Sequence, residues 1–337
     1  MKILVTGGTG YIGSHTVVEL QNKCYDVIIA DNLSNSYAYV VDKIELITGK
    51  RPLFVKIDLS DKSETAEFFN KHSDISGIIH FAAYKAVGES MDNPLMYYRN
   101  NLDSTINVLE GMKDHNIRNL VFSSSCTVYG QPDELPVKET SPVKDAWSPY
   151  GNTKQIAEQI IKFVTLKHQI KSIALRYFNP IGAHHSALIG ELPIGVPNNL
   201  VPFITQTAVG KRKLLKVFGS DYNTPDGTPI RDYIHVVDLA EAHVIAIDRM
   251  ISGKSKQNFE IFNLGTGNGF SVLEVINSFE KVTGQKLNYE ITGRRPGDIE
   301  KVWADTSCAN LELGWKAKHN LDDMISSAWK WELNLKS

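Results

Sequence analysis

The sequence has few cysteines and lacks the spacings that combine cysteine or histidine into a metal site. Its three cysteines, Cys24, Cys126 and Cys308, are odd in number and widely scattered. This usage is typical of a reducing cytosol and not of a disulfide-stabilised secreted fold. Neither Cys-x-x-Cys nor His-Glu-x-x-His occurs, and His184 and His185 are adjacent instead of one helical turn apart. We therefore expect no metal site.

Long apolar runs and an excess of charge of either sign are also missing. No run approaches the ~20 apolar residues of a membrane span, and the chain begins directly with a strand-like segment, so we expect no signal peptide. The net charge is −2 and the isoelectric point about 6.6, which gives no basic field for nucleic acid or an anionic membrane. The length and the hydrophobic content of 42% suit one large or two medium domains. We expect a cytoplasmic protein.

A glycine-rich turn follows the first apolar segment. Residues 3–5 read as a buried parallel strand, and a helical pattern begins after residue 13. Gly7, Gly10 and Gly13 between them are spaced G-x-x-G-x-x-G, one position away from the common dinucleotide fingerprint. Such glycines let the backbone approach a pyrophosphate, and the helix N-terminus supplies N–H donors. An ordinary turn is the alternative, but the strand before and helix after favour dinucleotide binding.

An acidic residue ends the second predicted strand, residues 27–30. Asp31 comes eighteen residues after Gly13, where a carboxylate accepts hydrogen bonds from the ribose of NAD and repels the additional phosphate of NADP. No arginine occurs in residues 32–36 to bind that phosphate. The sequence therefore predicts NAD, with a simple strand-end cap as the alternative role for Asp31.

Strand and helix patterns alternate up to about residue 180. Further candidate strands span residues 53–57, 77–81, 120–123 and 172–177, and candidate helices span residues 63–71, 94–113 and 151–167. This order predicts an α/β fold with a doubly wound parallel (Rossmann) sheet. Later segments, a helix near residues 200–209 and strands at 231–236 and 259–264, predict a smaller mixed α/β C-terminal domain. We expect a cofactor domain at residues 1–178, a substrate domain at 179–337, and segments within 231–265 that interleave with the first.

Two reactive side chains, Tyr150 and Lys154, lie one turn apart on the helix that begins near Pro149. An ammonium favours a phenolate, and a cationic nicotinamide would favour it further. A tyrosine that titrates near ~10 needs a pKa roughly 3 units lower to act as a base at neutral pH. The pair alone is more often an exposed helix face.

The strand that ends at Ser123–Ser125 adds hydroxyl groups at the ligand-binding edge of the sheet. We expect Cys126 beside it to be a small buried residue without a catalytic role, and His80 to be a structural histidine.

Taken together, the motifs resemble the extended short-chain dehydrogenase/reductase family, and within it the UDP-glucose 4-epimerases. The resemblance covers nearly the whole chain and rests on residues 6–13, 31–33, 80–90, 123–125, 150, 154, 176–180, 197–200, 231–235, 263–265 and 294–298. It implies reversible C4 epimerisation of UDP-glucose and UDP-galactose through a 4-ketopyranose, with tightly bound NAD. A homodimer packed through the helices at 94–113 and 151–167 is also implied.

The resemblance also implies roles for individual residues. Tyr150 would be the acid/base, Lys154 would tune it and hold the nicotinamide ribose, and Ser125 would complete the catalytic set, all three also contacting the cofactor. The remaining NAD site would comprise the glycines of the turn and Tyr11, Ile12, Asp31, Asn32, Leu33, Ser34, Asn35, Ser36, Asp58, Leu59, Phe81, Ala82, Ala83, Tyr84, Lys85, Asn100 and Phe178. The nucleotide sugar would contact Lys85, Ser125, Tyr150, Asn179, Asn199, Leu200, Lys216, Val217, Phe218, Arg231, Arg295 and Asp298.

Residue chemistry independently suits three of the substrate positions. Arg231 and Arg295 could bind phosphate in a bidentate manner, although each arginine alone could be a surface ion-pair partner, and Phe218 could pack on uracil. Val302 stands where strictly hexose-specific bacterial relatives often have tyrosine. We expect the smaller side chain to admit a 2-acetamido group, so that UDP-GlcNAc and UDP-GalNAc would also interconvert.

Three other functions compete with epimerisation. Nucleotide-sugar dehydratases share the 4-keto intermediate but eliminate water with an Asp-Glu pair, where this chain has Cys126 and Thr127. UDP-glucuronate decarboxylases usually have glutamate at the Thr127 position. A non-catalytic NAD-binding regulator would keep Asp31 but have little reason to keep Ser125, Tyr150 and Lys154 together.

Overall fold

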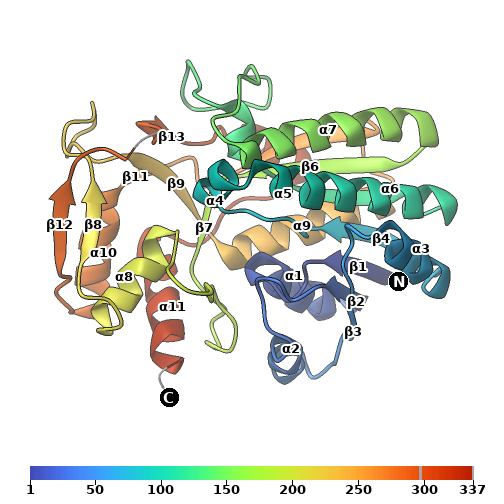
Figure 1. The fold of residues 1–337 in the computed structure, drawn as a ribbon, viewed down its shortest axis with the longest axis horizontal. Helices are drawn as coiled ribbons and strands as arrows, with labels where there is room; N and C mark the ends of the chain where they lie inside the picture. The colour runs from blue at the N-terminus through green and yellow to red at the C-terminus, as the bar shows by residue number, and fades with distance from the viewer. Residues whose placement is uncertain (296–297, 336–337) are drawn as a thin grey trace.

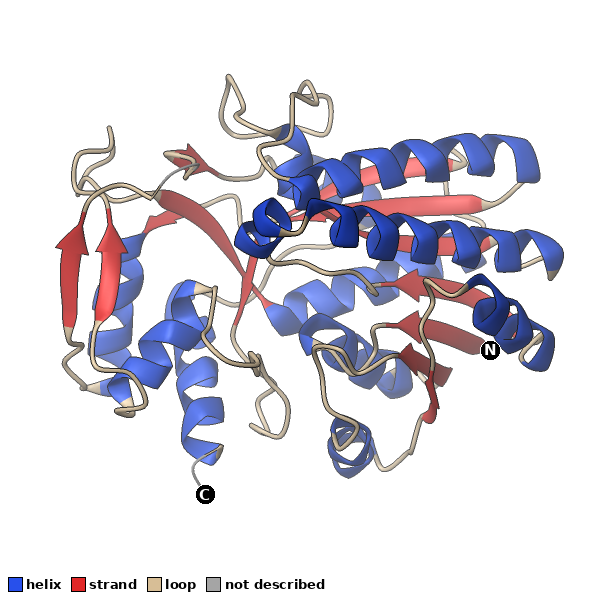
Figure 2. Ribbon diagram, in the orientation of Figure 1, coloured by secondary structure: helices blue, strands red, loops and turns tan. Residues whose placement is uncertain are grey.

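The computed structural model describes residues 1–295 and 298–335 and contains a seven-stranded parallel sheet (Figures 1 and 2). The strand order is β10-β6-β5-β4-β1-β2-β3, so the order in which successive strands are added reverses between β1 and β4. The strands are β1 (Lys2–Thr6), β2 (Asp26–Asp31), β3 (Leu53–Lys56), β4 (Ile75–His80), β5 (Asn119–Ser125), β6 (Lys171–Tyr177) and β10 (Phe259–Leu264). The predicted doubly wound parallel sheet is confirmed.

Helices cover both faces of this sheet because its strands are apolar on both sides. Ile3 and Val5 of β1 pack against one layer, and Leu4 between them packs against the other. The first layer contains α1 (Tyr11–Asn22), α2 (Val40–Thr48) and α9 (Val236–Ile251). The second contains α3 (Lys62–Lys71), α6 (Ser104–Asp114) and α7 (Pro149–His168).

The predicted helix at 94–113 is divided into pieces. It comprises α5 (Pro94–Tyr98), a π-helical turn (Arg99–Asp103) and α6, and the short α4 (Val87–Asp92) precedes it. A 3₁₀ turn (Cys126–Tyr129) follows β5, and a second π-helical turn spans Ala309–Leu313. The helix α9 has no counterpart among the predicted elements.

The second region lies beside the carboxyl ends of the main strands, on the left in Figure 1. One sheet contains β7 (Asn179–Ile181), β9 (Ile230–His235), β11 (Gly269–Ser271) and β13 (Lys301–Val302), and a separate pair contains β8 (Leu215–Phe218) and β12 (Tyr289–Thr292). Its helices α8 (Leu200–Ala208), α10 (Val272–Thr283) and α11 (Leu321–Asn334) enclose their own apolar core.

The two late strands predicted from the sequence therefore have different locations. Strand β10 pairs with β6 and extends the main sheet, whereas β9 pairs with β7, β11 and β13 in the second region. Helix α9 leads from β9 back to the main sheet, so the chain crosses between the regions more than once. Within the described ranges, no helix combines the length and apolarity needed to cross a membrane.

Candidate active site

A cavity of about 1460 Å³ opens where the carboxyl ends of the main strands face the second region. Ligands of doubly wound folds bind at this edge, near the point where the strand order reverses. Of the residues that the sequence assigns to the site, all but four line the cavity. The four that do not are Leu33, Ser125, Phe178 and Val302.

The glycine turn forms the floor of the cofactor half. Gly7 has φ +68°, and a Cβ added there would lie 2.9 Å from the backbone nitrogen of Ala82. A Cβ on Gly13 would lie 2.2 Å from the Gly7 carbonyl oxygen, so helix and turn pack too closely for a side chain. Helix α1 starts here without a side-chain cap from the described residues. This backbone cradle at a helix N-terminus fits a pyrophosphate.

Asp31 is fixed at the end of β2 by local hydrogen bonds. Its carboxylate accepts hydrogen bonds from the Leu33 N–H at 2.9 Å, the Ser36 hydroxyl at 3.1 Å and the Thr9 N–H at 3.2 Å. Leu33 adopts φ +62°, which bends the chain back toward the carboxylate. Leu33 thus shapes the site through its backbone, and Asp31 is presented on the cavity wall where a ribose hydroxyl could bind.

Tyr150 and Lys154 both lie on the cavity wall, as the four-residue spacing predicts. Pro149 begins α7, and the Ser148 hydroxyl caps it by accepting a hydrogen bond from the Gly151 N–H at 3.1 Å. The Lys154 ammonium donates to the Ser123 carbonyl at 2.7 Å and lies 5.9 Å from the Tyr150 ring centre. Burial lowers the pKa of Lys154 to about 8, and the neighbouring Glu158 acts in the opposite direction.

The pKa of Tyr150 is raised above its usual range, first by burial and next by the proximity of Tyr177. The Ser125 hydroxyl lies close enough to the phenol to favour the phenolate, but its effect is smaller. The protein alone therefore keeps Tyr150 protonated at neutral pH. The lower pKa that base catalysis requires must come from an additional positive charge, such as a nicotinamide ring in this cavity.

The other reactive groups near β5 have structural roles. Burial raises the pKa of the Cys126 thiol to about 12, so it is not a nucleophile at neutral pH. Burial lowers the pKa of His80 to about 3, and its ring contacts the hydroxyls of Thr6 at 2.8 Å and Thr105 at 3.2 Å. The neutral imidazole therefore joins β1, β4 and α6. Among the described residues, no cluster of His, Cys, Asp or Glu could hold a metal ion.

Several of the predicted nucleotide-sugar residues lie in the second region. Arg231 of β9 forms an ion pair with Asp298 at 2.5 Å, and Arg295 lies 3.6 Å from the same carboxylate. The Arg295 guanidinium also lies 6.0 Å from the Phe218 ring centre. Two arginines and an aromatic ring thus occur on one wall, although residues 296–297 of the motif lie outside the described ranges.

Phe178 and Val302 lie behind the cavity wall. Both are buried in a small apolar cluster with Val128, Tyr129 and Val137. Strand β13 brings Val302 beside Arg231 of β9, which lines the cavity, so this apolar cluster adjoins the arginine wall.

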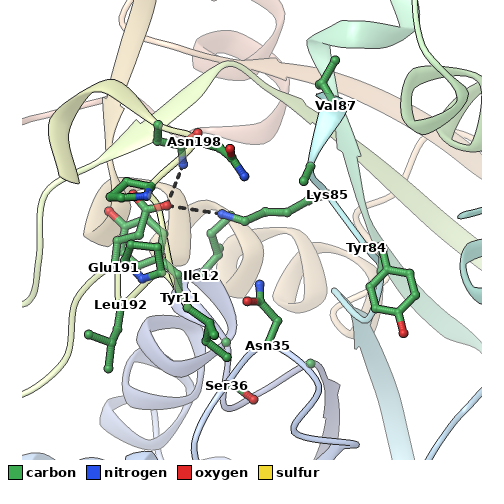
Figure 3. Close-up of a pocket in the computed structure, with 18 of the residues that line it drawn as sticks. Tyr11, Ile12, Asn35, Ser36, Tyr84, Lys85, Val87, Glu191, Leu192 and Asn198 are labelled. Atoms are coloured by element: carbon green, nitrogen blue, oxygen red, sulfur yellow. Dashed lines mark hydrogen bonds and ion pairs between the residues drawn. The ribbon is translucent and has the colours of Figure 1, made fainter. Parts of the chain in front are cut away.

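Sequence reasoning missed several cavity residues in irregular segments. Glu191 lies between β7 and α8, and its carboxylate lies 3.3 Å from the Lys85 ammonium (Figure 3). The carboxylate also accepts a hydrogen bond from Asn199 at 2.6 Å. Trp331 lines the cavity as well, and its indole N–H donates to the Glu191 carbonyl at 2.9 Å. Glu191 lies in a loop without periodicity, and the periodicity of α11 does not show that Trp331 meets this loop.

Comparisons with known proteins agree with this geometry. The profile of the family described as GDP-mannose 4,6 dehydratase matches residues 4–328. The UDP-glucose 4-epimerase of Yersinia enterocolitica is 50% identical over 333 residues, which cover 98% of this chain and 97% of that protein. That of Bacillus subtilis is 49% identical over 333 residues, with the same coverage. The chain belongs to the UDP-glucose 4-epimerase family.

Solved structures of UDP-glucose 4-epimerases have the same fold. The enzyme of Stenotrophomonas maltophila, crystallised with NAD and formylated UDP-arabinopyranose, aligns with a TM-score of 0.96 at 48% identity and covers 100% of this chain and 99% of its own. The Bifidobacterium longum enzyme with NAD⁺ and UDP aligns with a TM-score of 0.94 at 48% identity, covering 99% and 98%.

The matching family model is named for a dehydratase, whereas the relatives described above are epimerases. Cys126 and Thr127 stand at the positions where a dehydratase is expected to have its Asp-Glu pair. With a thiol pKa of about 12 and a hydroxyl at these positions, the site lacks the acid and base that eliminate water. The residues that distinguish the activities therefore match an epimerase.

Proposed function

We propose that this chain interconverts UDP-glucose and UDP-galactose by inverting C4 of the hexose, with NAD as its retained cofactor. The observation that carries the proposal is the position of Tyr150. Tyr150 lines the same cavity as the glycine turn with Asp31 and as Arg231 with Arg295. A sugar hydroxyl bound against the arginine wall would thus reach both a base and a cofactor.

Each part of the site has a role in this proposal. NAD, when bound by the glycine turn and Asp31, would supply reversible hydride transfer at C4. Tyr150 takes the proton of the 4-hydroxyl group and gives it back, while the Ser125 hydroxyl hydrogen-bonds the same oxygen. Lys154 stabilises the phenolate and holds the nicotinamide ribose. We assign the cofactor half to residues 1–178 with segments within 231–265, and the nucleotide-sugar half to the rest of 179–337.

Inversion adds a further requirement, because the keto sugar must present its other face before the hydride returns. The protein should therefore hold UDP firmly and the hexose loosely. Two arginines and an aromatic ring on the UDP wall support this division. Since oxidation and reduction cancel, no external oxidant is consumed.

The test is to equilibrate the purified protein with UDP-galactose, without added NAD, and to measure UDP-glucose. Conversion without added cofactor supports both the reaction and the retained NAD. Formation of a 4-keto-6-deoxy sugar would identify a dehydratase instead, and absence of any turnover even with added NAD would contradict the proposal.

We also propose that the chain accepts UDP-GlcNAc and UDP-GalNAc, because Val302 leaves more space than tyrosine behind Arg231. Val302 is buried beside Phe178 and does not itself line the cavity, so its effect would be to set the position of the wall. We expect Val302→Tyr to lower kcat/KM for UDP-GlcNAc at least fivefold more than for UDP-glucose. A difference of this size corresponds to ~1 kcal/mol of transition-state binding energy lost through overpacking at the wall. Equal changes for both substrates would contradict this proposal.

We propose a homodimer formed through α5, α6 and α7. These helices pack together and expose large apolar side chains, among them Leu95 (76% exposed), Phe163 (71%) and Leu166 (61%). Large apolar side chains exposed on neighbouring helices support an interface there. We expect Phe163→Glu to shift the protein from dimer to monomer in light scattering, because a buried unpaired carboxylate is costly. A wild-type monomer, or an unchanged mass in the variant, would contradict the dimer.

A cytoplasmic location completes the proposal. Cys24, Cys126 and Cys308 are all free thiols, which suits a reducing compartment. The near-neutral charge balance supports a small-molecule partner, and nothing in it favours nucleic acid.

A further inference from the structure

A three-residue bridge spans the border between the two halves of the cavity. Lys85 follows β4 on the cofactor side, Asn199 is the N-cap residue of α8 on the sugar side, and Glu191 stands between them. The Glu191 carboxylate accepts a hydrogen bond from the Asn199 amide at 2.6 Å and lies 3.3 Å from the Lys85 ammonium. Figure 3 shows the Lys85 side chain extended toward this carboxylate. All three residues line the cavity.

The backbone of Glu191 is fixed from behind. Its carbonyl accepts a hydrogen bond from the Trp331 indole at 2.9 Å, and Gly190 forms a β-bridge with Ala183. Gly190 lies so close to Trp331 that an added Cβ would be 2.5 Å from the ring. Because this segment is clamped, the carboxylate stays in the cavity whether or not Lys85 is paired with it.

A carboxylate at this place opposes the binding of anions. The Glu191 side chain is only 11% exposed, so water screens its charge poorly. Lys85, by contrast, is half exposed on a flexible stem and can turn to another partner. Lys85 and Asn199 offer a cation and an amide donor to an anion such as a diphosphate in the same cavity, and both contact Glu191.

We propose that Glu191 is a built-in competitor of the nucleotide-sugar diphosphate for Lys85 and Asn199. This inference rests on the proposed function, because it takes a UDP-sugar as the ligand. Glu191 limits the affinity for UDP that the arginine wall provides. It thereby sets how fast the nucleotide sugar leaves after the hexose has been inverted.

The test is Glu191→Gln, which keeps the shape and the acceptor for Asn199 but removes the charge. Titration calorimetry with UDP on the NAD-containing protein should give a Kd about fivefold lower than wild type, the size expected for removal of one partly screened charge interaction. The KM for UDP-galactose should fall with it. Glu332→Gln is the matched control, because Glu332 is also a buried carboxylate paired with a lysine, Lys211 at 2.7 Å, but it does not line this cavity. Its Kd for UDP should equal that of wild type.

The variant Lys85→Met separates competition from positioning. If Glu191 competes, Glu191→Gln tightens UDP binding in the Lys85→Met background too, because the unneutralised carboxylate repels the diphosphate. If Glu191 merely orders Lys85, Glu191→Gln weakens binding in the wild-type background and has no effect in Lys85→Met. The second pattern, or an unchanged Kd in Glu191→Gln, overturns the inference. Wild-type protein that binds no UDP would instead contradict the proposed function.

Discussion

Replacing Tyr150 with phenylalanine should lower kcat for UDP-galactose by roughly 10²- to 10⁴-fold, the range of general acid–base catalysis. The variant loses the phenol that we propose exchanges a proton with the 4-hydroxyl. It keeps the aromatic ring, which is buried in the first turn of α7. The NAD content and the Kd for UDP should therefore stay near wild-type values. Turnover measured with UDP-galactose, together with cofactor content per protein, checks both expectations.

Tyr97→Phe is the matched control for this variant. Tyr97 is a fully buried tyrosine whose phenol accepts a hydrogen bond from the Ala86 N–H at 3.0 Å, and it does not line the cavity. It should retain a kcat near that of wild type. Full turnover by Tyr150→Phe would remove the proposed acid/base from the mechanism.

Glu158→Gln should destabilise the protein by roughly 3 kcal/mol, since a buried ion pair that loses one partner leaves an uncompensated charge. The Arg176 guanidinium donates to the Glu158 carboxylate from Nε at 2.9 Å and from Nη2 at 2.6 Å, and the two side chains are only 4% and 9% exposed. The measurement is urea unfolding of the NAD-containing protein. A loss below about 0.5 kcal/mol, the size of an ordinary surface substitution, would contradict the expectation.

The same variant has a catalytic consequence through Lys154. Glu158 raises the pKa of Lys154, one turn away on α7, against the larger lowering by burial. Without that carboxylate the pKa falls further, so the ammonium is lost at a lower pH. The alkaline decline of kcat should therefore begin at lower pH in Glu158→Gln. Glu110→Gln is the control, because its ion pair with Lys62 is exposed and contributes little.

The regular part of the fold is predictable because burial leaves a pattern in the sequence. Each strand of the main sheet is a short apolar run between turns, and the Tyr150–Lys154 pair follows from helical spacing. Helix α9 follows directly on β9 without a break, so the change from one element to the other has no turn residue to mark it. The position of β9 also had no local signal, since its partners β7, β11 and β13 are distant in sequence.

The cavity was predictable only where motifs define it. The glycine turn, Asp31 and the arginines have residue types that their chemistry requires. Glu191 and Trp331 meet only because a loop and the last helix fold together, which no local pattern expresses. The raised pKa of Tyr150 is another such property, because it depends on how completely the phenol is enclosed and not on the neighbouring lysine alone.

The location of β10 has a consequence for how the chain is made. This strand forms the outer edge of the main sheet beside β6, although more than eighty residues separate them, and α9 covers β4, β5 and β6 from the same late part of the chain. When only the first half of the chain has left the ribosome, the hydrophobic face that α9 and β10 later cover is still exposed. Cutting the gene near codon 178 would consequently yield two fragments that need each other, instead of a self-sufficient nucleotide-binding module.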